Sequence, residues 1–268
     1  GQAAFVENNT VHAVPRLLQA LADHGLQPEQ VAYIIITHLH FDHAGGTSAL
    51  AARCPNATVL AHPRAVRHLA DPSRLIASVT RVYGQAEYDR LYSPITPIDP
   101  ARIFATGMSN GGMLIDPARI RGMEDGEAVR LGTRELRFLH TRGHANHHVS
   151  IHDLRVNGVF SGDCFGAEFR PWRQSRLPFL VCSCAPTDFD PAEARASVRR
   201  ILDTGARRIY VTHFGELKDP DGGAEALLHS IDAMEAITDE ALARGLEGDA
   251  LRAFCEEGIH EACRRQLE

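Results

Sequence analysis

The sequence predicts an α/β fold in which helices pack on the outer faces of β-sheets. Three observations support this prediction. A β-branched apolar run at residues 31–37 has the length and composition of a strand buried on both faces. Two turn signals between short apolar runs, Gly132-Thr133 and Asn157-Gly158, predict hairpins further along. Helical patterns accompany strands in both halves of the chain, which leaves open whether there is one sheet or two.

The first half of the sequence predicts alternating strands and helices. In order, these are a strand at 3–6, a helix from Pro15 to about His24, the strand at 31–37, a helix at 46–53 and a strand at 58–61. Asp71-Pro72, a capping residue before a proline, then starts a helical stretch expected to run toward Tyr92. The residues from 93 to 115 are rich in proline and glycine and predict irregular structure.

The second half of the sequence predicts two hairpins followed by helices. The hairpins combine residues 128–131 with 135–140, and 149–153 with 159–161. Asp190-Pro191 caps a helix expected to end near Gly205, and residues 208–212 form a strand. From Gly222 onward the chain is expected to be almost wholly helical, with one apolar face.

Composition excludes several classes of protein. The formal net charge is −6, and no basic stripe favours nucleic acid or an anionic membrane. No apolar run reaches the roughly 20 residues that cross a bilayer. No signal peptide is recognisable, so we expect a cytoplasmic protein, although the abrupt start suggests that an upstream segment is lacking. Cys182-Ser-Cys184 has no second pair to complete a zinc site and predicts two free thiols.

The segment Thr37-His38-Leu39-His40-Phe41-Asp42-His43 directly follows the buried strand. Active-site residues often lie in loops at the carboxyl ends of such strands. Residues two apart in an extended segment point the same way, so His38 and His40 can bind one metal ion together. Asp42 and His43 follow as the chain turns, and they can face a neighbouring position. Imidazole and carboxylate ligands suit zinc, iron or manganese.

Three later residues are candidates for further metal ligands, because one loop cannot surround an ion. Each follows a predicted strand: His144 follows the strand ending at His140, Asp163 follows the strand at Val159, and His213 follows the strand at 208–212.

In order and approximate spacing, the series His38-x-His40-x-Asp42-His43, His144, Asp163, His213 resembles the metallo-β-lactamase superfamily. The resemblance covers about residues 3 to 215 and implies one domain over residues 1–268, built as a four-layer αββα sandwich. A helical insert at about 71–115 would lie over the active site, and residues 222–268 would form a helical C-terminal extension. The strands that normally precede residue 3 are missing.

The resemblance also implies two divalent metal ions. His38, His40 and His144 would bind the first ion, Asp42, His43 and His213 the second, and Asp163 would bridge them. Zinc is favoured, with iron or manganese as alternatives. Two departures concern residues around the ligands: Glu7 stands where the family usually has an aspartate that supports the metal loop, and Arg142 replaces the usual proline before Gly-His.

The string at residues 38–46 resembles lactonases and glyoxalase II-type thioesterases. It implies hydrolysis of a small ester, lactone or thioester by a hydroxide shared by the two ions, with Asp42 orienting the nucleophile or taking its proton. The alternatives are an iron-dependent member that uses oxygen, as in persulfide dioxygenases or diiron oxygen-binding proteins, and a non-catalytic ligand-binding relative. The expected partner is a small-molecule substrate. Two roles are equally compatible with the helical tail: it could form a homodimer contact, or it could cover the pocket.

Four side chains are candidates to line the substrate pocket. Tyr83, Tyr88 and Tyr92 in the insert could protonate a leaving group, although packing on a helix face explains them at least as well. His147, three residues after His144, could lie at the pocket wall.

Overall fold

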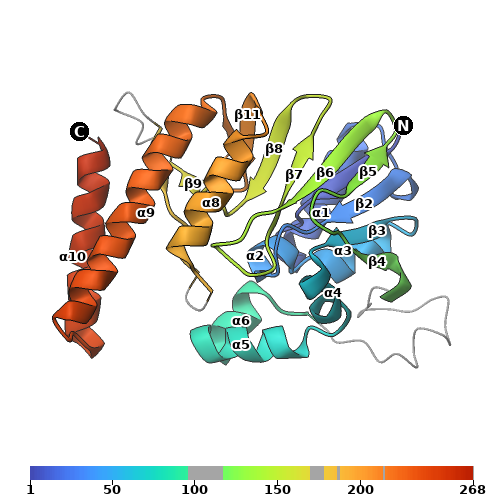
Figure 1. The fold of residues 1–268 in the computed structure, drawn as a ribbon. Helices are drawn as coiled ribbons and strands as arrows, with labels where there is room; N and C mark the ends of the chain where they lie inside the picture. The colour runs from blue at the N-terminus through green and yellow to red at the C-terminus, as the bar shows by residue number, and fades with distance from the viewer. Residues whose placement is uncertain (96–116, 170–177, 186–187, 214, 268) are drawn as a thin grey trace. The chain divides into compact units, whose positions relative to one another are not determined.

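The computed structural model describes residues 1–95, 117–169, 178–185, 188–213 and 215–267. The chain divides into two compact units, Gly1–Phe138 (unit 1) and Leu139–Glu268 (unit 2), and each is described by itself. Both units combine strands with helices (Figure 1), as the sequence predicts for an α/β protein.

Unit 1 contains a parallel four-stranded sheet. Its strands, in the order β1-β2-β3-β4, are β1 (Ala3–Val6), β2 (Val31–Ile35), β3 (Thr58–Ala61) and β4 (Ile120–Gly122). The helices of this part are α1 (Val14–Asp23), α2 (Phe41–Ala44), α3 (Thr47–Arg53) and α4 (Pro63–Ala70), with short 3-10 turns at Val11–Ala13, Pro28–Gln30 and Pro117–Arg119. Fully buried Ile34, Leu50 and Val59 belong to one core cluster, which shows that β2, α3 and β3 pack together.

The helical stretch expected between Asp71 and Tyr92 is two helices, α5 (Ser73–Tyr83) and α6 (Gln85–Leu91). Gly84 separates them because its φ of +84° is incompatible with a right-handed helix. The expectation of irregular structure at 93–115, and with it part of the expected insert, falls mostly outside the described residues. Unit 1 also holds the hairpin of β5 (Ala128–Leu131) and β6 (Arg134–His140), with β6 running to the unit boundary.

Unit 2 contains the second predicted hairpin, β7 (Val149–Asp153) and β8 (Gly158–Gly162). Strand β11 (Arg208–Val211) pairs in parallel with β8, and β12 (Gly215–Leu217) pairs antiparallel with β11. The sheet order is β12-β11-β8-β7-β6-β5, so the boundary between the units falls within strand β6. Two short strands, β9 (Ala167–Glu168) and β10 (Leu180–Val181), pair separately.

Three helices complete unit 2: α8 (Pro191–Leu202), α9 (Pro220–Ala243) and α10 (Gly248–Leu267). Helices α9 and α10 lie side by side (Figure 1), with Gly258 of α10 against Ile237 of α9. Gln266 near the end of α10 donates from Nε2 to the Leu180 carbonyl oxygen at 2.9 Å. Helix α10 therefore contacts α9 at Gly258, and its predicted apolar residues are half-buried. Within the described ranges, no helix has both the length and the apolar character needed to span a membrane.

Candidate metal centre

The predicted metal-binding loop follows β2 and leads directly into α2. His40 is the N-cap residue of α2, and the His43 amide donates to the His40 carbonyl oxygen at 3.0 Å. The loop residues after the strand therefore close into one helical turn instead of continuing as an irregular loop. His38 and His43 are fully buried, whereas the Asp42 side chain is 45% exposed. We call His38, His40, Asp42 and His43 the unit 1 ligand group.

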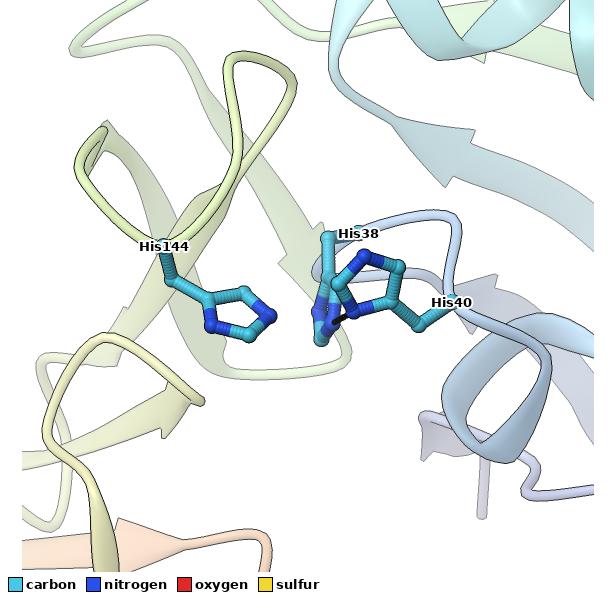
Figure 2. Close-up of side chains that lie close together, drawn as sticks. All are labelled: His38, His40 and His144. Atoms are coloured by element: carbon cyan, nitrogen blue, oxygen red, sulfur yellow. Dashed lines mark hydrogen bonds between the residues drawn. The ribbon is translucent and has the colours of Figure 1, made fainter. Parts of the chain in front are cut away.

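Nitrogen and oxygen atoms of this group lie close together in two pairs. His38 Nε2 and His40 Nδ1 are 3.0 Å apart, as the dashed line in Figure 2 marks. His43 Nε2 lies 3.4 Å from Asp42 Oδ2. Ligand atoms about 2.0–2.2 Å from a tetrahedral zinc ion are roughly 3.3–3.6 Å apart. The His43–Asp42 separation falls in that interval and is long for an N–H···O hydrogen bond.

Glu7, at the end of β1, orients two of these histidines through one carboxylate oxygen. The Nδ1–H of His43 donates to Glu7 Oε1 at 2.7 Å. The Thr37 hydroxyl also donates to Glu7 Oε1, so its oxygen accepts from His38 Nδ1 at 3.0 Å. Ligand atoms of Glu7, His38 and His43 lie within 4.8 Å of one another. A carboxylate that holds Nδ1 fixes the tautomer in which Nε2 is the metal-binding nitrogen.

Aromatic side chains of the insert pack near this loop. The Phe41 ring centroid lies 5.6 Å from that of Tyr92 and 6.3 Å from that of Tyr88. Burial raises the pKa of Tyr92, and the negative charge of Asp42 raises it further. Burial opposes the ionisation of Asp42 itself, but the interaction of its carboxylate with the neighbouring His43 ring outweighs burial and lowers the Asp42 pKa to about 2. Asp42 is therefore a carboxylate at neutral pH, whereas Tyr92 keeps its proton.

The other predicted ligands form a unit 2 ligand group, His144, Asp163 and His213. His144 lies in the loop after β6 (Figure 2), Asp163 directly follows β8, and His213 follows β11. Asp163 Oδ2 is 3.6 Å from His144 Nε2, and Asp163 Oδ1 is 3.4 Å from His213 Nε2. Each oxygen of one carboxylate thus faces a different histidine, at a separation typical of two ligands on one tetrahedral ion. The distances are too long for direct hydrogen bonds.

Two residues outside the predicted ligand set, Ser183 and His148, hold this second group in position. The Ser183 hydroxyl donates to Asp163 Oδ2 at 2.8 Å, and the Ser183 carbonyl oxygen accepts from His144 Nδ1 at 2.8 Å. His148 Nε2 accepts from the Asp163 amide at 3.2 Å, and its Nδ1 lies 2.9 Å from the Thr141 hydroxyl. In the sequence, only its closeness to His144 distinguishes His148. No sequence pattern points to Ser183, because its two partners lie about 20 and 39 residues away in the chain.

The donor set fits divalent metal ions. Both groups consist of imidazole nitrogens and carboxylate oxygens, the ligands that zinc and iron take in proteins. In His38, His43 and His144 an acceptor holds Nδ1, as is usual for metal-binding histidines. The structure describes all seven predicted ligand residues, and within each unit it brings them together.

The candidate pocket residues differ in their surroundings. Tyr88 is buried and Tyr92 half-buried, whereas Tyr83 is 53% exposed. His147 is half-buried in the loop that carries His144. Their contact with a substrate stays a prediction.

The family model described as "Metallo-beta-lactamase superfamily" matches residues 10–213. A metallo-beta-lactamase fold-containing protein of Sulfurisphaera tokodaii is 29% identical over 192 residues, which cover 70% of this chain. The chain matches 62% of the length of that relative.

Solved structures share the fold. One is an archaeal metallo-beta-lactamase superfamily protein from Sulfolobus tokodaii, with a TM-score of 0.57 and 21% identity, covering 88% of this chain and 80% of that one. Another is a chemotaxis sensor whose structure contains a peroxy diiron species, with a TM-score of 0.57 and 14% identity, covering 85% of this chain and 82% of that one.

Proposed function

The chain belongs to the metallo-beta-lactamase superfamily and has its α/β sandwich fold, and we propose that it is a dinuclear metal-dependent hydrolase of small esters, lactones or thioesters. In this proposal the unit 1 and unit 2 ligand groups bind the same two ions. Family membership supports the assignment of ligands: His38, His40 and His144 to one ion, Asp42, His43 and His213 to the other, and Asp163 to both.

The arrangement of Asp163 is the observation that carries the proposal. A bridging carboxylate must offer one oxygen to each of two ions. The arrangement of Asp163 within unit 2 supports this role, because its Oδ2 lies 3.6 Å from His144 Nε2 and its Oδ1 lies 3.4 Å from His213 Nε2. A carboxylate that served a single ion would not need a histidine beside each oxygen.

When bound, two divalent ions lower the pKa of a shared water toward 7 and polarise the carbonyl group of a substrate. The chain's own side chains then provide orientation and proton transfer. Asp42 is ionised and accepts a hydrogen bond that orients the nucleophile. The Tyr92 hydroxyl, protonated and packed on Phe41 next to the metal loop, is the proposed donor to the leaving group.

Metal analysis with an activity screen tests this proposal. Protein purified without added metal is analysed for zinc, iron and manganese, and the apo-protein is reloaded with each metal. We expect two ions per chain and hydrolysis of at least one lactone, thioester or aryl ester. Asp163→Asn should bind fewer than two ions, whereas Asp188→Asn, a change near α8 outside the ligand groups, should bind two. An absence of turnover for every substrate and metal would refute hydrolysis.

The same measurement decides about oxygen chemistry. The shared fold with a diiron chemotaxis sensor makes iron the main competing metal. If the protein contains two iron ions, shows a visible absorption band and hydrolyses no substrate, the hydrolase proposal would give way to an oxygen-using protein. Two metal ions with neither reaction would favour the ligand-binding alternative.

A further inference from the structure

Cys182 and Cys184 flank Ser183, the residue that contacts two proposed metal ligands. Their sulfur atoms lie 3.8 Å apart. Both cysteines are free thiols, with Cys184 exposed and Cys182 half-buried. Cys164 also lies beside the unit 2 ligand group, directly after Asp163, but it is buried and its sulfur contacts the Ser150 hydroxyl.

Ser183 holds its two partners through different atoms. Its side-chain hydroxyl binds Asp163 Oδ2, and its main-chain carbonyl binds His144 Nδ1, both at 2.8 Å. Any change in the backbone at Ser183 therefore moves both contacts together. The amide of the preceding residue, Cys182, donates to the Ser230 hydroxyl of α9 at 2.9 Å, so the backbone just before Ser183 is held in place.

A disulfide between the two cysteines would change this backbone. The S–S bond length is about 2.05 Å, so the sulfur atoms must approach by about 1.8 Å. The bond would close a small ring that contains the main-chain N, Cα and C atoms of Ser183. Because Cys182 is anchored at α9 and Cys184 is exposed, the movement falls on Ser183 and Cys184.

We propose that Cys182 and Cys184 form a reversible disulfide that displaces Ser183 from Asp163 and His144 and so weakens metal binding. This inference rests on the proposed metal centre. The oxidant is a peroxide, and the exposed Cys184 reacts first. Its thiolate attacks one peroxide oxygen and forms a sulfenic acid, while the other oxygen leaves as water after protonation. The Cys182 sulfur then attacks the Cys184 sulfur and releases a second water, so two thiols and one peroxide give one disulfide and two waters.

The two thiols differ as these roles require. The hydrogen bond between the sulfur atoms lowers the pKa of Cys184, against the opposing effect of burial. The same bond raises the pKa of Cys182, and burial raises it further. A lower thiol pKa and greater exposure are the features of a cysteine that reacts with peroxide, and a nearby second thiol resolves it.

The test follows the cross-link and the metal affinity separately in the full chain. Reduced, zinc-loaded protein is treated with hydrogen peroxide, digested and analysed for a Cys182–Cys184 cross-link. The zinc dissociation constant is measured by competition with a chromogenic chelator before oxidation, after oxidation and after re-reduction with a dithiol. We expect the cross-link to form and the dissociation constant to rise about 10–100-fold, the usual effect of losing an orienting contact, and then to recover.

Variants separate the possible causes. Cys184→Ser should form no cross-link and keep its zinc affinity in peroxide, whereas Cys255→Ser, a change on α10, should behave as the unmodified chain does. In reduced protein, Ser183→Ala should weaken zinc binding, and Ser183→Thr should restore it by keeping the hydroxyl. Absence of the cross-link, or a cross-link with unchanged zinc affinity, would overturn the switch. If the reduced chain binds no zinc at all, the proposed metal centre fails instead, and the cross-link assay still reports on the cysteines.

Discussion

Glu7 links the orientation of two histidines to one negative charge. Its Oε1 accepts directly from His43 and, through Thr37, holds His38. Glutamine at this position keeps the length of the side chain but removes the charge that favours a basic, metal-binding Nε2 on His43. We expect Glu7→Gln to raise the zinc dissociation constant about 10–100-fold, measured by chelator competition.

Glu29→Gln provides the matched control, because Glu29 is an exposed glutamate of unit 1 outside the ligand group. Its zinc affinity should equal that of the unmodified chain. Equal affinities in Glu7→Gln and Glu29→Gln would mean that Glu7 contributes only to folding, which thermal unfolding of both apo-proteins would then reveal.

At the residue scale, local patterns predicted the ligand candidates better than their supports. His38, His40, Asp42 and His43 stand in one short segment after a strand, so sequence spacing alone brings them together. The later candidates, His144, Asp163 and His213, were proposed because each follows a predicted strand. No sequence pattern points to Ser183, because its contacts depend on how distant segments of the chain pack. The only feature near it in the sequence is the pair of cysteines that flank it.

The loop between β6 and β7 is the element that presents His144, and Gly143 determines its path. Gly143 has a φ of +113°, and an added Cβ would lie 2.3 Å from the backbone nitrogen of Ala194 in α8. Both the conformation and the contact exclude a side chain. We expect Gly143→Ala to lower the free energy of unfolding by about 2–5 kcal/mol, the sum of the backbone and steric costs, and to weaken zinc binding. Urea unfolding and chelator competition measure the two effects.

Gly132 offers the comparison. It also has a positive φ, +59°, in the turn between β5 and β6, but an added Cβ would meet nothing within 4 Å. Gly132→Ala should therefore lower the free energy of unfolding by only about 1–2 kcal/mol, the cost of placing alanine at a positive φ, and should leave the zinc affinity unchanged. A larger loss of stability in Gly132→Ala than in Gly143→Ala would contradict the steric argument.

Elements with strong local signals were predicted well. The two hairpins carry their turn residues in the sequence, and the helices α8 and α9 start at Asp-Pro pairs whose aspartates accept from backbone amides. Sequence reasoning missed α2, α4, β4, β9, β10 and β12, which are short or depend on pairing with distant partners. It also joined α5 to α6, because the effect of Gly84 on the backbone depends on a φ value that a sequence does not show.

At the scale of the whole molecule, the seven proposed ligands extend from residue 38 to residue 213 in sequence. Each ligand group is already oriented by its own unit, through Glu7 in one and Ser183 in the other. The proposed ligand side chains of each group are therefore already oriented without an ion, and metal binding requires little rearrangement within either group. The homodimer expected from the C-terminal helix stays a prediction, and the predicted apolar residues of α10 are half-buried within the single chain.

Metal removal should therefore lower stability without abolishing the fold. An unfolded chain does not hold seven ligands at fixed spacing, so zinc binds the folded state preferentially, and this stabilises it by about 2.7 kcal/mol per site at 100 times the dissociation constant. We expect the melting temperature of apo-protein to rise with zinc concentration, and the far-ultraviolet circular dichroism to change little. Magnesium, which prefers six oxygen ligands, should raise the melting temperature much less than zinc does. In Asp163→Asn the zinc-dependent rise should shrink, because the amide that replaces the proposed bridging carboxylate offers only one oxygen and no negative charge. A melting temperature that zinc leaves unchanged would contradict the proposed centre, since any ion held by these residues must stabilise the state that arranges them.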